Sequence, residues 1–330
     1  MEPLSLQELE LNVNAPVQSL AGIWAKKYVE KLDSQDEQLF WEAKAPPMRR
    51  LTAEKLSQSL RTASSQAWAK TEILLAREIK RHGIDPELID PWAIAQDSHR
   101  IYRKALAGYA EQAPPQRLSV LIGSDVGRLR HKYTAQDPRV IGFVSMQFHY
   151  SGQILLQQLS ASEQPLVNSY FKVIDDHLYM PLQRAYEAAA AHNEHSPTLR
   201  AVQQLLPVSS EIARSICQRV AQLYANYRCY SGVLPHPSVQ ISSIRDVEMF
   251  QIYLCVCVLE GSVAAIQQEL FPLCVMLYPT LQVSWELVRQ MLHLLGQEIT
   301  HRLQQEHAKT FEPYFKVLWE MFSPAVLPEG

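Results

Sequence analysis

The chain has 330 residues, of which 47% are apolar and 20% are charged, and its formal net charge at pH 7 is −3. These values indicate a folded globular protein with a sizeable core, and they exclude a chain dominated by disorder. The slight negative charge disfavours a broadly basic nucleic-acid-binding protein but leaves room for a local basic patch. With only 11 glycines, the chain is poor in the residue that turns and phosphate-binding loops use, which favours an all-α fold.

The first helix that we predict carries an apolar stripe at spacings of three and four residues, which places its members on one helical face. The stripe consists of Val17, Leu20, Trp24, Tyr28 and Leu32. Ser-x-x-Glu patterns at Ser5–Glu8 and Ser34–Glu37 resemble capping boxes and predict helix starts on either side of this stripe.

Two long helices are predicted next. A proline-free stretch from Thr52 ends in Lys-Arg-His followed by Gly83, which is typical of a helix C-terminus with cations at the negative end of the dipole. The stretch from Pro86 to Gln112 is also helical in pattern, with Pro91 in its first turn or at a break.

Segment 113–138 interrupts the helical pattern, because prolines and glycines gather there. They are Pro114, Pro115, Gly123, Gly127 and Pro138. We interpret the segment as a linker or hinge between an N-terminal helical domain, residues 1–112, and a C-terminal helical domain, residues 139–330. At most a short strand is expected, near residues 118–122.

Helical patterns resume after the linker, and Ser196, Ser243 and Ser284 are predicted to cap helices. The most apolar window, Met249–Pro279, contains glutamate and glutamine well before the roughly 20 residues of a membrane span, so we interpret it as core. The predicted fold class is therefore all-α, a bundle-like array of long amphipathic helices.

Asp175, Asp176 and His177 are adjacent in sequence, which suggests a reactive site. Neighbouring residues on a helix point about 100° apart, so the three cannot converge on one ligand without help from other helices. Pro181 cannot donate to the carbonyl of His177, so a kink or helix boundary is expected there. Aromatic residues are frequent around this stretch and could line a pocket. The candidate ligand-binding residues are His149, Asp175, Asp176, His177 and Tyr179.

A basic cluster in and after the predicted linker is a second candidate site, for an anion, an acidic partner or an RNA phosphate. It consists of Arg128, Arg130, His131, Lys132 and Arg139. The glycine spacing around it does not match a P-loop or a dinucleotide-binding motif. A solvated charged loop is the alternative interpretation.

No metal, cofactor or catalytic residue is predicted. Cys255 and Cys257 are separated by one residue in apolar surroundings, which favours core packing over zinc binding. Glu298 and His301 form one Glu-x-x-His motif, whereas di-iron bundles use two. With five cysteines in no regular framework, we expect reduced thiols.

Two stretches, YFKVIDDHLYMPLQRAYEAAAAH and LEGSVAAIQQELFPLCVMLYPTLQVSWELV, resemble conserved but uncharacterised helical proteins of cyanobacteria. The resemblance implies a cytoplasmic or thylakoid-associated accessory role. It implies no particular activity and no particular site residues.

The leading functional hypothesis is a non-enzymatic soluble scaffold, assembly factor or regulator that acts through a protein partner or self-association. A ligand- or metal-binding protein, or an enzyme, with a pocket around His149, Asp175 and His177 is the second hypothesis. Contact with an anion or nucleic acid through Arg128–Lys132 is the third. Because no basic segment precedes an apolar core at the start of the chain, we expect a cytoplasmic protein. We expect no membrane span, and peripheral membrane association remains open.

Overall fold

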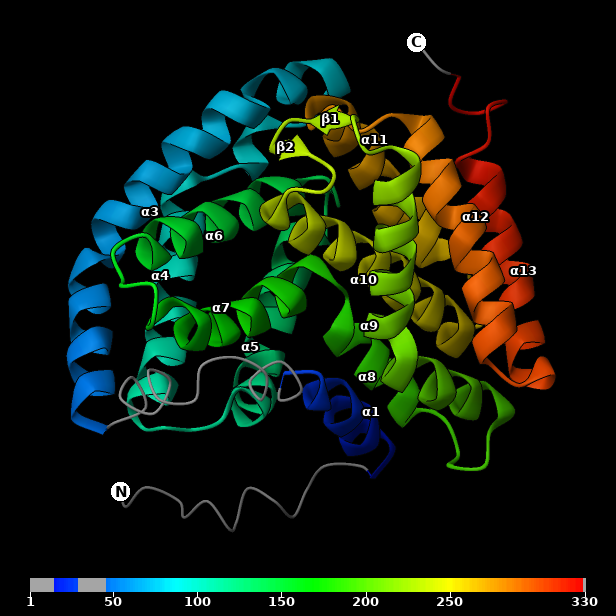
Figure 1. The fold of residues 1–330 in the computed structure, drawn as a ribbon, viewed down its shortest axis with the longest axis horizontal. Helices are drawn as coiled ribbons and strands as arrows, with labels where there is room; N and C mark the ends of the chain where they lie inside the picture. The colour runs from blue at the N-terminus through cyan, green and yellow to red at the C-terminus, as the bar shows by residue number, and fades with distance from the viewer. Residues whose placement is uncertain (1–14, 29–45, 329–330) are drawn as a thin grey trace.

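The computed structural model describes residues 15–28 and 46–328. Within these residues the fold is almost entirely helical, with a single two-stranded antiparallel sheet (Figure 1). The predicted all-α class is confirmed.

The helices follow one another through short connections. The first half contains α1 (Ala15–Lys26), α3 (Pro46–His82), the 3-10 helix η2 (Pro86–Leu88), α4 (Pro91–Ala110), α5 (Pro115–Thr134) and α6 (Val140–Leu156). The second half contains α7 (Gln164–Tyr179), α8 (Leu182–Ala190), α9 (Pro197–Leu223), β1 (Arg228–Cys229), β2 (Gly232–Val233), α10 (Pro237–Glu260), the π-helix η3 (Ala265–Leu270), α11 (Phe271–Thr280), α12 (Trp285–Arg302) and α13 (Gln305–Met321).

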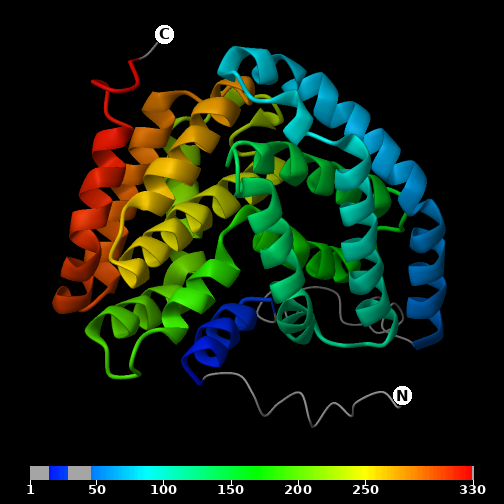
Figure 2. The same cartoon turned by 180° about the vertical axis from the view of Figure 1, so that it is seen from behind.

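The long helix α3 curves along one side of the molecule, and α12 and α13 lie on the opposite side (Figure 1). Helix α3 packs against α4 and α6, α5 packs against α7, and α10 packs against α8, α9 and α13. Seen from behind, α4 and α5 run next to each other inside the curve of α3 (Figure 2). The helices α6, α7 and α10 meet in the interior.

The N-terminal helix predicted from the apolar stripe is confirmed as α1. Leu20, Trp24 and Tyr28 are buried, and α1 packs against α5, α8 and α9. Leu32 and the two Ser-x-x-Glu patterns, Ser5–Glu8 and Ser34–Glu37, lie outside the described residues.

The predicted end of α3 is confirmed, because the helix stops at His82 and Gly83 follows with a φ of +60°. Ser284 caps α12 as predicted, accepting from the backbone N–H of Leu287 at 3.3 Å. The helix start predicted at Ser243 is wrong, because α10 begins at Pro237, where His236 is the cap. Proline at the first helical position set this earlier start.

Residues 113–138, interpreted as a linker, consist largely of α5. The short strand considered near 118–122 is helical instead, with Leu118 and Ile122 buried. Gly123 and Gly127 are packing positions: a Cβ on Gly127 would lie 2.4 Å from Cγ of Gln183. The two glycines therefore let α5 approach α7 and α8 closely. The division into two domains remains a prediction.

The apolar window Met249–Pro279 is confirmed as core. Every residue from Met249 to Leu259 is buried, and the aromatic side chain of Tyr278 near its end is buried as well. Across residues 15–28 and 46–328, no helix combines the length and the apolar character needed to cross a membrane.

Candidate functional site

Asp175, Asp176 and His177 point into three different surroundings. Asp175 faces a cleft, Asp176 enters a buried cluster of charges, and His177 packs against α5. This outcome follows from helical geometry, because each residue is rotated by about 100° from the one before it. The structure therefore does not join the three into one constellation.

The first surroundings form a cleft of about 450 Å³ between α6, α7 and the start of α10, which we call the His149 cleft. Its polar lining residues are His149, Gln153, Gln164, Asn168, Lys172, Asp175, Asp176, Ser238, Ser242 and Arg245. His149 Nδ1 lies 3.6 Å from Asp175 Oδ2, and the side-chain amide of Gln153 lies 2.9 Å from His149 Nε2. If that amide donates to Nε2, the Nδ1 proton of a neutral ring points towards Asp175.

Behind the cleft, Arg245 covers the ring of Tyr179, with 4.0 Å between Cζ and the ring centroid. Burial opposes the charge of Arg245, but Tyr179 and Asp246 raise its pKa above the usual value. Burial also raises the pKa of Tyr179 well above the usual value. Tyr179 is therefore a neutral packing partner of Arg245 at the rear of the cleft.

The second surroundings form the buried ion cluster, defined here as Lys27, Lys172, Asp176 and Glu248. Asp176 accepts from Lys172 Nζ at 2.8 Å and lies 3.2 Å from Lys27 Nζ. Glu248 accepts from Lys27 Nζ at 2.8 Å, and its second oxygen accepts from Ser210 Oγ at 2.6 Å. The two cations and two anions balance each other across α7, α10 and the end of α1.

The buried ion cluster holds both carboxylates in the charged form. Burial alone would raise the pKa of Asp176, but Lys172 and Lys27 hold it well below its usual range. The same two lysines lower the pKa of Glu248 against the effect of burial. Lys27 also lies over the ring of Trp24, 3.6 Å from the centroid, which adds a cation–π contact. Because the charges are paired, the cluster has the features of a structural element.

The third surroundings hold His177 as a neutral ring. Its Nδ1 lies 2.9 Å from the carbonyl of Val173, to which it donates, and its Nε2 accepts from Ser119 Oγ at 3.2 Å. Burial lowers the pKa of His177 to about 4. A histidine with both nitrogens occupied and no access to solvent links α7 to α5, and it offers no atom to a ligand.

The helix boundary expected at Pro181 is confirmed, because α7 ends at Tyr179 and α8 begins at Leu182. Arg130 from α5 donates to the freed carbonyls of Leu178 and Tyr179, at 2.6 and 3.2 Å. Its second terminal nitrogen contacts the hydroxyl of Tyr253. Arg130 is thus a buried cap for the end of α7.

The other members of the predicted basic cluster are more exposed than Arg130 and point elsewhere. Arg128 pairs with Asp125 in its own helix, and Lys132 binds Asp97 Oδ2 at 2.9 Å. Arg139 forms a two-pronged pair with Asp137 and donates to the carbonyl of His82 at 2.7 Å, while His131 is exposed. The cluster therefore does not form one patch, and its contact with an anion or partner remains a prediction.

The remaining sequence candidates are structural. Cys255 and Cys257 are buried in the core as predicted, and burial raises their pKa values above that of a free thiol. Glu298 accepts from Arg302 Nε at 2.7 Å and from Ser215 Oγ at 2.9 Å, so its carboxylate is engaged, while His301 is exposed. Among the described residues, no three His, Cys, Asp or Glu side chains gather as metal ligands.

Sequence reasoning missed two groups of residues. The pairing of Lys27 with Glu248 joins residues 221 positions apart, and the only local signal was a charged residue directly before the apolar run of α10. The second group lines a basic cleft between α3 and α4, where cationic and aromatic side chains recur at helical spacing. That recurrence is visible in the sequence once the two helices are paired as neighbours.

One comparison with known proteins gave a match. Residues 171–321 match the family model described as "Phycobilisome protein". The match covers slightly less than half of the chain, including most of α7 after its first turns and all elements from α8 to α13. It fits a helical, light-harvesting-related protein of the cyanobacterial type. No curated protein and no solved structure matched the chain.

The matched segment contains part of each site described above. Asp175 and Arg245 of the His149 cleft lie within it, whereas His149 lies before it. Three of the four charges of the buried ion cluster lie within it, and Lys27 does not. The basic cleft between α3 and α4 lies wholly outside it.

Proposed function

We propose that this protein is a non-enzymatic helical component that associates with phycobilisome proteins, as a scaffold, assembly factor or regulator. The observation that carries the proposal is the family match over residues 171–321. Support also comes from the chemistry of the described residues, where the buried titratable groups are paired in structural contacts. Phycobilisome family proteins assemble with other proteins or with themselves, so association is the activity that we assign.

A surface on the matched segment supports this assignment. Ile241, near the start of α10, is 59% exposed and lies on the rim of the His149 cleft. Tyr230, in the turn between β1 and β2, is also exposed and lines the adjoining cavity, which shares His149 and Arg245 with that cleft. Two large apolar groups beside a polar cleft are typical of a protein contact with a polar rim.

The test is binding to isolated phycobilisomes. The purified full chain is mixed with intact phycobilisomes and with their separated subunits, and the mixtures are resolved by gradient sedimentation and native mass measurement. We expect the chain to co-sediment or to form a complex of defined mass with at least one subunit. If it stays at the top of the gradient and yields no complex with any subunit, the proposal fails.

Two matched variants locate the contact. Ile241→Asp places a charge on the proposed surface and should reduce binding at least tenfold, since a desolvated apolar anchor is worth about 2 kcal/mol. Ile73→Asp is the control, because Ile73 on α3 is 82% exposed and lies outside the matched segment. Equal binding by both variants would remove the rim of the His149 cleft from the proposal.

The His149 cleft supports a second function, binding of a small polar ligand. Its supporting observation is the approach of His149 to Asp175 in a hollow that also contains Lys172 and Arg245. Elemental analysis and an absorption spectrum of the purified protein test for a bound metal or chromophore. His149→Ala should then lower ligand content while leaving phycobilisome binding intact, which separates the two functions.

A further inference from the structure

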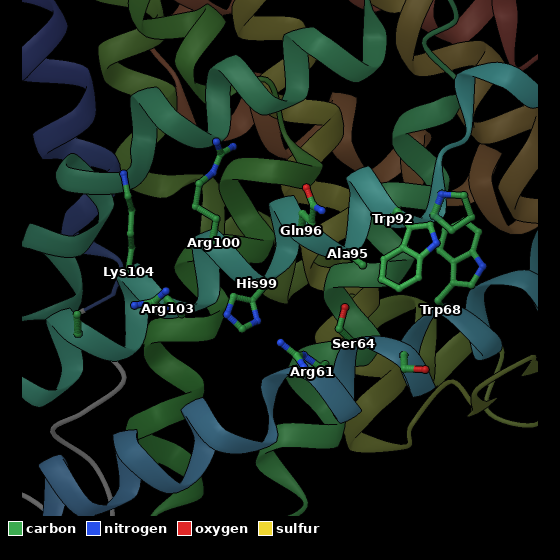
Figure 3. A pocket seen from close by; sticks show the side chains of 13 residues that line it. Arg61, Ser64, Trp68, Trp92, Ala95, Gln96, His99, Arg100, Arg103 and Lys104 are labelled. Carbon is green, nitrogen blue, oxygen red and sulfur yellow. The ribbon is translucent and has the colours of Figure 1, made fainter.

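A second cleft, which we call the α3–α4 cleft, has a volume of about 1120 Å³ and lies between the antiparallel helices α3 and α4 (Figure 3). Thirteen residues from the two helices line it. They are Arg61, Ser64, Ser65, Trp68, Pro91, Trp92, Ala95, Gln96, His99, Arg100, Arg103, Lys104 and Ala107. The cleft is large enough for a drug-sized ligand.

The two ends of the α3–α4 cleft differ in chemistry. Figure 3 shows Trp68 and Trp92 next to each other at one end, and Arg61, His99 and Arg103 towards the other. Trp92 is 79% exposed, although a large aromatic side chain gains free energy when it is covered. One end therefore offers flat apolar surface and the other offers guanidinium groups.

The charge of the α3–α4 cleft is not balanced by its own lining. No lining residue carries a carboxylate. Arg100 and Lys104 pair with Asp97 and Asp125, which lie outside the lining.

Two cations in the cleft are free to act on a ligand. Arg61 and Arg103 have no hydrogen-bond or ion-pair partner among residues 15–28 and 46–328. They contribute to the positive potential that, together with burial, lowers the pKa of the nearby His99. Uncompensated guanidinium groups in a cleft are suited to a carboxylate, sulfonate or phosphate, because their planar donors bind two oxygens at once.

Helical spacing explains why these side chains meet. Arg61, Ser65 and Trp68 recur at intervals of four and three on α3, and Trp92, Gln96, His99 and Arg103 recur at four, three and four on α4. Each set forms one stripe. The short connection after Gly83 makes the helices antiparallel, so Trp68 lies opposite Trp92 and Arg61 lies opposite Arg103.

We propose that the α3–α4 cleft binds a small organic anion with a flat aromatic body. The tryptophans stack on the body, and Arg61 and Arg103 hold its acidic group. The site goes beyond the association with phycobilisome proteins and does not depend on it, because every lining residue precedes the matched segment.

A pair of fluorescent probes tests the proposal. Anilinonaphthalene sulfonate has a flat aromatic body and an anionic group, and N-phenyl-1-naphthylamine has the same rings without the sulfonate. Both are titrated into the full chain and followed by probe fluorescence and by energy transfer from tryptophan. We expect the sulfonate to bind at least tenfold more tightly, since a hydrogen bond to a charged group is worth about tenfold or more. Its affinity should fall as salt is raised, because the contact is partly exposed.

Variants assign the binding to this cleft. Arg61→Gln and Arg103→Gln should each weaken sulfonate binding about tenfold and leave the uncharged probe unchanged. Trp92→Leu should weaken both probes, and because Trp92 is exposed it should not disturb folding. Arg77→Gln is the matched control, since Arg77 is an exposed arginine on α3 outside the lining.

Three results would overturn the proposal. Equal affinity for the two probes would show that the arginines hold no acidic group. Sulfonate binding that survives both arginine substitutions would place the probe elsewhere on the protein. An unchanged affinity in Trp92→Leu would show that no aromatic stacking occurs. Circular dichroism of every variant is compared with that of the original chain, so that loss of binding is not mistaken for loss of fold.

Discussion

Two adjacent aspartates should respond very differently to the same substitution. Asp176→Asn removes a negative charge from the buried ion cluster, where the side chain has 0% exposure and contacts Lys27, Lys172 and Tyr28. Asp175→Asn removes the same charge from the His149 cleft, where the side chain is 25% exposed and its ion-pair partner is a histidine at 3.6 Å. The pair is therefore an internally matched test of burial.

The magnitudes follow from what each charge leaves behind. Without Asp176, two lysines face one carboxylate in a closed space, and breaking a buried ion pair on one side costs about 3–5 kcal/mol. Because the asparagine oxygen can still accept from Tyr28, we expect the lower end of this range, about 3 kcal/mol. A partly exposed pair contributes about 0–1 kcal/mol, so Asp175→Asn should cost less than about 1 kcal/mol.

The assay is urea unfolding at pH 7, followed by circular dichroism and by tryptophan fluorescence, with coincident transitions as the criterion for a single step. Asp176→Asn/Lys27→Met restores charge balance and should be more stable than the single variant. This comparison holds even if Asp176→Asn alone unfolds. Equal losses in the two single Asn variants, or a double variant less stable than Asp176→Asn, would refute the structural role of the cluster.

The remaining predictions concern pH and packing. His177 has a pKa of about 4 in the fold and about 6.5 when unfolded, so the unfolded chain binds a proton first as the pH falls. The free energy of unfolding should therefore be complete above pH 6.5 and fall by about 3 kcal/mol by pH 4. Urea unfolding at intermediate pH checks this, with a smaller fall expected in His177→Asn. Gly127→Ala should destabilise by about 1–3 kcal/mol, because its Cβ would lie 2.4 Å from Gln183. Gly123→Ala, whose Cβ would sit 3.5 Å from His177, should be neutral or stabilising by up to about 1 kcal/mol. Thermal unfolding of the two alanine variants separates these outcomes, and equal behaviour would contradict the packing argument.

Local features of the sequence were sufficient for much of the fold. The α1 stripe, the stop at Gly83 and the boundary at Pro181 depend on residues within a few positions of one another, so periodicity and backbone chemistry predict them. The angular spread of Asp175, Asp176 and His177 was predictable for the same reason. It follows from helix geometry alone.

Features that depend on distant residues were not predictable. Gly123 and Gly127 signal either a break or a close approach, and only the position of His177 and Gln183 against them decides which applies. The sequence thus placed a linker where the structure has a packed helix. Likewise, nothing near Arg130 indicates that its partners are the carbonyls of Leu178 and Tyr179.

The buried ion cluster also bears on how the matched segment is completed. Lys172, Asp176 and Glu248 belong to residues 171–321 and carry a net charge of −1 among them, while Lys27 from the N-terminal part supplies the compensating cation. An uncompensated buried carboxylate is costly, so α1 is an electrostatic part of the phycobilisome-like half. The α3–α4 cleft, by contrast, needs no residue of that half. The N-terminal helices therefore do two separate things: they close the charge balance of the matched segment, and they carry a surface of their own.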